Sequence, residues 1–151
     1  MNGSILPALV VGAAALPAAA APVPLPAGVP GQWIELEVRD RAVLRYAIAP
    51  ESLAVGGDGV VRYVVALPSG SARNVVFEGI RCGDARYTLY AYLAPDGRWR
   101  RYPGEGWHRV ARGAGHRVVL YRRHFCDQRG RPRPRAEILR RLGAEAVRGA
   151  P

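Results

Sequence analysis

Apolar and polar positions alternate along much of the chain after Trp33. In residues 33–38 (WIELEV), Ile34, Leu36 and Val38 fall on one side of an extended backbone, and Glu35 and Glu37 fall on the other. A period of two is typical of a half-buried β-strand. Residues 42–49 (AVLRYAIA) continue as a second expected strand, which we expect Pro50 to end.

Turn sequences separate the β-rich runs that follow. Residues 56–59 (GGDG) lie between SLAV and VVRYVVAL, residues 68–70 (PSG) end that run, and residues 95–97 (PDG) separate RYTLYAYLA from RWRRY. Gly and Asp tolerate the backbone conformations of tight hairpins, and Pro favours the first corner of a turn. Residues 60–102 therefore predict a four-stranded antiparallel meander.

The periodicity changes beyond Gly113. In residues 116–126 (HRVVLYRRHFC), Val118, Tyr121 and Phe125 recur at helical spacing; VVLY alone also suits a strand, but the length of the run favours a helix. A second short helix follows in PRAEILRRLGAEA, and we expect it to weaken or end at Gly143. The expected fold is α+β: an antiparallel β-sheet meander with one or two C-terminal helices packed on one face.

The N-terminus is typical of an export signal. An uncharged apolar run, ILPALVVGAAAL, precedes small residues, although its first four residues carry no positive charge. It is too short for a membrane span and contains prolines, so a secretory signal cleaved near Ala20 is favoured over an anchor. We expect a signal peptide over 1–20, a Pro/Ala-rich mobile leader over 21–32, a single α+β domain over 33–143 and a frayed tail over 144–151. No membrane span is expected in the mature form.

The chain carries a formal charge of +10, and all 22 of its basic residues are arginine. Such a balance can indicate nucleic acid or an anionic surface. However, Ala, Gly, Pro and Arg, which G/C-rich codons encode, dominate the composition, and the arginines are scattered except in residues 129–135. We interpret the charge mainly as compositional bias and expect no nucleic-acid partner. The partners that we consider are an envelope protein and an anionic envelope component.

Cys82 and Cys126 are the only cysteines. In an exported domain a lone pair favours a disulfide, and closing a loop of this size restricts the unfolded chain by roughly 4 kcal/mol. Two alternatives are a redox-active pair, for which no Cys-x-x-Cys is present, and a metal site that adds His124 and His108 or His116. We favour the disulfide, joining the end of a central strand to the end of the first helix.

Motifs for catalysis or cofactor binding are absent from the sequence. There is no G-x-S-x-G element, no phosphate-binding loop and no spaced carboxylate pair, and we expect each of the three histidines to be solvated. We therefore assign no catalytic residue, metal site or cofactor and lean against an enzyme.

A polar set around the cysteines is the remaining candidate site: Arg73, Asn74, Glu78, Arg81 and Arg122. In a strand, Asn74, Glu78 and Cys82 share a face with apolar residues, where a lone carboxylate is costly to bury. A structural ion pair between Glu78 and Arg122 or Arg123 is favoured over a ligand site.

Several of these segments resemble the cryptic neisserial periplasmic protein family. The similarity rests on ARNVVFEGIRC, the following Tyr- and Leu-rich strand, a Trp-containing hairpin, LYRRHFC and the earlier YAIAPESLAVGGDGVVRYVV, and it spans about Trp33 to Leu142. The resemblance implies an exported periplasmic bacterial domain without an assigned biochemical role, and it supplies no catalytic residues. Some members are lipoproteins, whereas this chain has no cysteine after its signal.

Three hypotheses follow for the function. The first is a periplasmic, disulfide-linked domain that binds an envelope component without catalysis. The second is an envelope-acting hydrolase that uses Glu78 and arginine contacts on an anionic polymer. The third is a structural subunit of an envelope assembly.

Overall fold

A computed structural model describes residues 21–40, 42–104 and 106–149 of the chain. The predicted signal peptide over 1–20 and the end of the predicted tail, residues 150 and 151, lie outside this range. None of the helices in the described part is long and apolar enough to cross a membrane.

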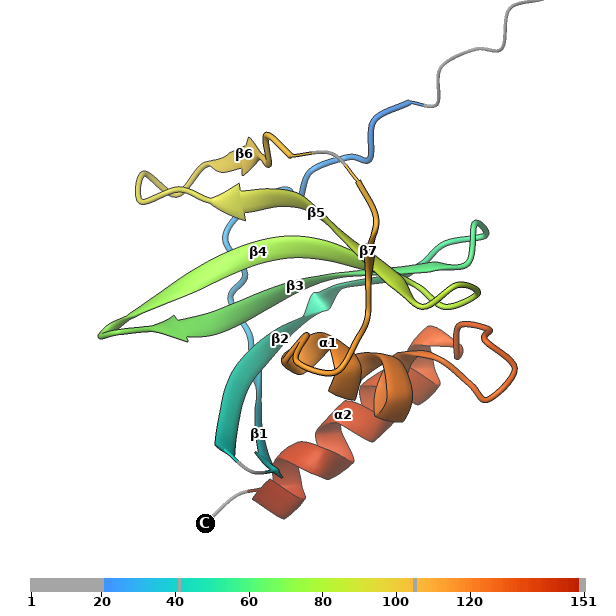
Figure 1. The fold of residues 1–151 in the computed structure, drawn as a ribbon. Helices are drawn as coiled ribbons and strands as arrows, with labels where there is room; N and C mark the ends of the chain where they lie inside the picture. The colour runs from blue at the N-terminus through green and yellow to red at the C-terminus, as the bar shows by residue number, and fades with distance from the viewer. Residues whose placement is uncertain (1–20, 41, 105, 150–151) are drawn as a thin grey trace, which may run out of the picture.

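The predicted α+β fold is confirmed, with one antiparallel sheet as its centre (Figure 1). Six strands follow one another in the order of the sequence, and a short seventh strand pairs with β5. The strands are β1 (Ile34–Asp40), β2 (Ala42–Val55), β3 (Val60–Ser69), β4 (Ala72–Arg81), β5 (Arg86–Leu93), β6 (Trp99–Arg101) and β7 (His108–Arg109). Strands β3 to β6 are the meander expected over residues 60–102.

Strand β2 continues through Pro50, so the expectation that this proline ends the strand is wrong. Its pairing with β3 shifts register between Ala49 and Ala54, which leaves the proline in a bulge where no ladder hydrogen bond is needed. The Ser52 hydroxyl bridges the bulge by donating to Ala49 O and accepting from Val64 N. From α2, the Arg135 guanidinium donates to Pro50 O and Leu53 O.

The helical segment expected near residue 116 forms in two parts. A short turn, α1 (His116–Val119), runs directly into the π-helix η1 (Leu120–Phe125), and the Cys126 amide closes it on Tyr121 O. After a loop, α2 (Arg135–Gly149) continues through Gly143 instead of ending there. Helical structure therefore extends beyond residue 143, where the sequence placed the end of the domain.

The helices cover one face of the sheet and form the larger core with it (Figure 1). Tyr63 and Ile80 of the central strands pack against Leu120 and Phe125, and Ile138 and Leu142 of α2 fill the side near β1 and β2. The fully buried Tyr63 ring meets Phe125 edge-on at a centroid distance of 4.9 Å.

The second face of the sheet carries a smaller core made with the N-terminal segment. Ala49, Val64, Phe77 and Ala91 are buried there, and Val23 and Leu25 pack against them. In Figure 1 this segment, drawn in blue, passes across the face away from the helices. Residues 21–32 contain no helix or strand, and their predicted mobility stays a prediction.

Candidate functional site

Glu78 lies at the centre of β4 with its side chain fully buried beneath α1. The Tyr63 hydroxyl donates to Oε2 at 2.7 Å, and His116 Nε2 lies 3.0 Å from the same oxygen. Arg117 binds the carboxylate at two points, through Nε to Oε2 at 3.2 Å and through Nη2 to Oε1. The carboxylate therefore has partners on both oxygens, and the Arg117 charge balances its own.

These partners keep Glu78 ionised in spite of its burial. Burial raises the pKa of the carboxyl, but hydrogen bonding and electrostatic attraction from His116 and then Arg117 outweigh it, so the pKa lies below its usual range. Burial and the neighbouring carboxylate raise the pKa of Tyr63 well above 10, which keeps its proton available as a donor. The site is thus a satisfied ionic cluster at neutral pH.

Helix geometry determines which arginine reaches Glu78. Arg117 sits in the first turn of α1, with its guanidinium 4.0 Å over the Tyr87 ring of β5. Arg122 and Arg123, the expected partners, lie on the exposed side of η1. The predicted ion pair therefore exists, but the partner is Arg117.

The other residues of the predicted polar set do not converge on Glu78. Arg73 pairs with Glu35 of β1 at 2.8 Å, and Asn74 is exposed. Arg81 pairs with Asp84 at 2.6 Å and stacks over Trp107. Because each arginine of β4 has a partner of its own, the set is not a single site.

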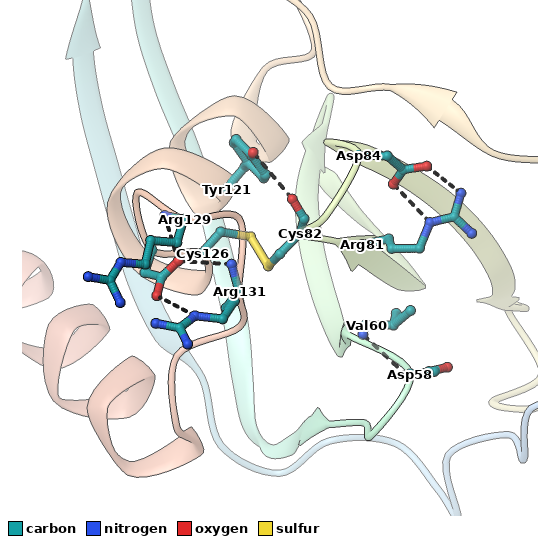
Figure 2. The surroundings of a disulfide bond; sticks show 10 residues. Asp58, Val60, Arg81, Cys82, Asp84, Tyr121, Cys126, Arg129 and Arg131 are labelled. Carbon is teal, nitrogen blue, oxygen red and sulfur yellow. Dashed lines mark hydrogen bonds and ion pairs between the residues drawn. A yellow bond between two sulfur atoms is a disulfide. The ribbon is translucent and has the colours of Figure 1, made fainter.

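The predicted disulfide between Cys82 and Cys126 is confirmed (Figure 2). It joins the residue after β4 to the residue after η1, and Tyr121 of η1 donates to Cys82 O. The Asp127 carboxylate holds the next loop by accepting from the amides of Arg129 and Arg131. Gly130 in this loop has a φ of +71°, and a Cβ there would lie 3.3 Å from Cys82 O.

Arginines gather around two adjoining open clefts at the end of the molecule where α2 meets β1 and η1. The clefts have volumes of about 660 and 400 Å³ and share Arg123, Glu145 and Arg148. Their charged lining is Arg39, Arg45, Arg122, Arg123, Arg141 and Arg148, against Glu37 and Glu145. Among the described lining residues, cations therefore outnumber carboxylates around this surface, which we call the arginine clefts.

Internal ion pairs occupy some of these arginines and leave others available. The Glu37 carboxylate accepts a hydrogen bond from Arg39 at 2.7 Å and another from Arg45 at 2.8 Å. These two bonds, of which the one from Arg45 has the larger effect, hold the pKa of Glu37 below its usual range. Among the side chains that the structure describes, which do not include that of Asp40, no carboxylate lies within ion-pair distance of Arg122 or Arg148. With respect to the described side chains, these two guanidiniums can receive an anion without giving up a carboxylate partner.

A buried histidine forms part of the wall of the smaller cleft. His124 is 2% exposed, and its Nε2 lies 2.9 Å from Glu145 Oε2, but neither ring nitrogen has a partner in hydrogen-bond geometry. Burial lowers the pKa of His124, and Glu145 opposes this only in part. An imidazole with unsatisfied nitrogens thus stands next to the surplus of arginine.

Solvated histidines were expected from the sequence, and this is wrong for two of the three. His116 and His124 are buried, and only His108 is exposed. His116, Leu120 and His124 recur at i, i+4 and i+8, so together they form one buried helical stripe. This spacing could have indicated that the two histidines are buried. In the same segment, however, Val118, Tyr121 and Phe125 form a more apolar stripe, which the sequence favours as the buried one.

Metal-ligating side chains do not cluster in the described residues. No group of three His, Cys, Asp or Glu side chains there is arranged to hold a metal ion. The alternative metal site through Cys82 and Cys126 is excluded because both sulfurs are used in the disulfide.

Fold and site define a small disulfide-linked α+β domain with a buried ionic cluster and a basic cleft surface. The chain belongs to the CNP1-like family, whose model matches residues 15–143. No curated protein and no solved structure matches the chain.

Proposed function

We propose that this protein is an exported module that binds a multiply charged anionic component of the bacterial envelope through the arginine clefts, without catalysis. The observation that carries the proposal is the position of Arg122 and Arg148, two guanidiniums without a carboxylate partner in the described chain, beside clefts with an excess of arginine. The planar donors of arginine suit phosphate and carboxylate groups.

The extent of the clefts favours a polymer over a single small anion. The two clefts share one wall, and their arginines come from β1, β2, η1 and α2. A chain of repeated phosphate or carboxylate groups can contact several of them at once. Because each exposed ion pair contributes little, affinity then depends on the number of simultaneous contacts.

Export to the periplasm is supported by the N-terminal apolar run and the disulfide. A small domain that contains a cysteine crosslink is typical of an oxidising compartment. We place the mature N-terminus near Ala21. N-terminal sequencing of the protein recovered from the periplasm of an expressing bacterium tests this, and an uncleaved cytoplasmic product would contradict it.

The buried position of Glu78 supports the non-catalytic part of the proposal. A general acid or base must come within hydrogen-bond distance of its substrate. Glu78 is fully buried, is bound by three side chains and lines neither of the arginine clefts. A hydrolase acting through this carboxylate therefore has no geometric support.

A binding titration tests the proposal. Isothermal titration of the protein with long-chain inorganic polyphosphate is expected to show saturable binding that weakens with salt. Replacing both Arg122 and Arg148 by Ala should weaken binding roughly tenfold, since each exposed charge contributes up to about 1 kcal/mol.

Arg98 and Arg112 provide a matched control. Both are exposed, and neither pairs with a carboxylate of the described chain or lies at the clefts. Their double replacement by Ala removes the same charge and should change binding by less than about twofold. Equal weakening in both double variants would show that net charge alone determines binding and would contradict the proposed site.

A further inference from the structure

The face of the sheet away from the helices carries a row of aromatic side chains. Phe77 of β4 lies 5.2 Å from the Tyr90 ring and 6.5 Å from the Trp99 ring, measured between centroids. Trp33 packs against the same small core. This surface, which we call the aromatic groove, lies on the opposite side of the sheet from the helix-facing core.

The chain's own N-terminal segment occupies the groove. Val23 and Leu25 pack against its core, and the Trp99 indole Nε1 donates to Gly28 O at 2.9 Å. Arg101 Nη2 donates to Val23 O at 3.1 Å. The segment is thus held by apolar contacts and by donors directed at its backbone carbonyls.

The segment has the composition of a polyproline-II ligand. Residues 21–31 (APVPLPAGVPG) contain four prolines and no charged residue, and they form neither helix nor strand. Proline fixes φ near −65° and favours the extended polyproline-II conformation. Grooves lined by aromatic rings bind such segments with a small loss of conformational entropy.

We propose that the aromatic groove is a recognition site for an uncharged proline-rich segment of another protein, and that residues 21–31 occupy it until such a segment displaces them. The Trp99 and Arg101 donors bind only carbonyl oxygens, which any extended segment presents. Recognition therefore depends on backbone conformation and on the side chains between the prolines.

The fit of the resident segment is incomplete. An open cleft of about 400 Å³ remains between it and the sheet, lined by Phe77, Ser52 and Glu51 together with residues 24–30. Val29 is 59% exposed and does not fill this space. A segment with a bulkier apolar residue between its prolines can fill the cleft and gain contacts that residues 21–31 do not make.

Displacement has to overcome the tether. Because residues 21–31 connect directly to β1, their effective concentration at the groove is in the millimolar range, as for a ligand on a short linker. A competing segment binds appreciably only if its own affinity exceeds that of the resident segment. This surface is independent of the arginine clefts, so its test does not depend on the proposed function.

The first arm of the test uses the intact chain. A synthetic peptide, APVPFPAGVPG, which carries Phe at the position of Leu25, is titrated to several millimolar while amide and indole resonances are followed by NMR. The expected result is saturable movement of the Val23 and Leu25 amides toward random-coil positions, with the Trp99 indole still hydrogen-bonded. The Trp107 indole, which stacks with Arg81 outside the groove, serves as the internal reference.

The second arm loosens the resident segment. Replacing Val23 and Leu25 together by Asp should leave the helix-facing core intact, which near-ultraviolet circular dichroism checks, and should free the Trp99 indole. The peptide APVPLPAGVPG should then restore the resonance of the hydrogen-bonded Trp99 indole. It should bind this variant at least tenfold more tightly than it binds the intact chain. The same peptide with Asp at both substituted positions should not bind.

Two results would overturn the proposal. One is the absence of saturable binding by both peptides in both arms. The other is release of the segment by raising the protein concentration alone, with a dimer in sedimentation, which would assign the groove to a second copy of this chain.

Discussion

Glu78 and Arg117 lie 39 residues apart in the sequence and form a two-point ion pair between β4 and the first turn of α1. The Glu78 side chain is fully buried and that of Arg117 is 17% exposed, so the pair connects the sheet interior to the helix that covers it. A buried pair adds little when compared with an apolar substitute of the same shape, but removing one partner leaves an uncompensated charge. The cluster therefore specifies how α1 lies on the sheet.

Replacement of Arg117 by Met is expected to cost about 3–5 kcal/mol in the free energy of unfolding, because the ionised Glu78 loses its counter-charge. Urea unfolding measures this. The double variant Glu78→Leu/Arg117→Met should lose less unfolding free energy than Arg117→Met alone, since no charge stays buried in it. Arg81→Met, which breaks the exposed pair with Asp84, is the control and should cost no more than about 1 kcal/mol.

Acid should weaken the Glu78 cluster in a defined pH range. The folded-state pKa of Glu78 is depressed below the ordinary pKa of 4.5. The ionised carboxylate therefore contributes to stability above pH 4.5, and this contribution is lost as the pH falls through the folded-state pKa. The stability difference between the wild type and Glu78→Gln should therefore shrink below about pH 4.5. A difference that grows on acidification would show that the pKa is raised instead.

His124 should make the fold sensitive to milder acid. Burial depresses the pKa of His124 in the folded chain. As the pH falls below about 6.5, the unfolded chain therefore binds a proton at this residue that the folded chain does not bind, and the free energy of unfolding decreases. His124→Gln should remove this loss between pH 7.5 and 5 in thermal unfolding experiments. Glu145→Gln removes the group that opposes the shift and should extend the loss to lower pH; a smaller loss in that variant would contradict the assignment.

Removal of the disulfide should affect the helical layer first. Cys82→Ala/Cys126→Ala opens a loop with a sequence separation of 44 and should cost about 4 kcal/mol. Hydrogen exchange should speed up in η1 before it does in β3 and β4, because the crosslink is the covalent connection of η1 to the sheet. Equal acceleration in the helix and the strands would show that the two layers unfold together.

The meander and the disulfide were predictable because their signals are local or compositional. Period-two alternation and the turns at 56–59 and 95–97 fix the strands, and a single cysteine pair allows one intramolecular bond. The passage of β2 through Pro50 was not predictable in this way. Its bulge depends on Arg135, 85 residues away in the sequence, which binds Pro50 O.

The candidate site was predictable only in its residue types. The sequence indicated that a carboxylate at position 78 needs a cation, but not which arginine provides it, because the direction of Arg117 depends on where α1 begins on the sheet. The arginine clefts join residues of β1 with residues of α2, and this contact exists only in the folded chain. Compositional bias also spreads arginines over the surface, so the sequence does not single out Arg122 and Arg148.

The most direct test of the proposed anion site is the behaviour of individual arginine side chains during binding. Arginine Nε–Hε resonances of the protein labelled with ¹⁵N can be followed while inorganic polyphosphate is added. Binding at the arginine clefts should give saturable shifts at Arg122 and Arg148, with Arg98 and Arg112 unchanged. Uniform small shifts over all exposed arginines, or shifts confined to residues outside the clefts, would contradict it.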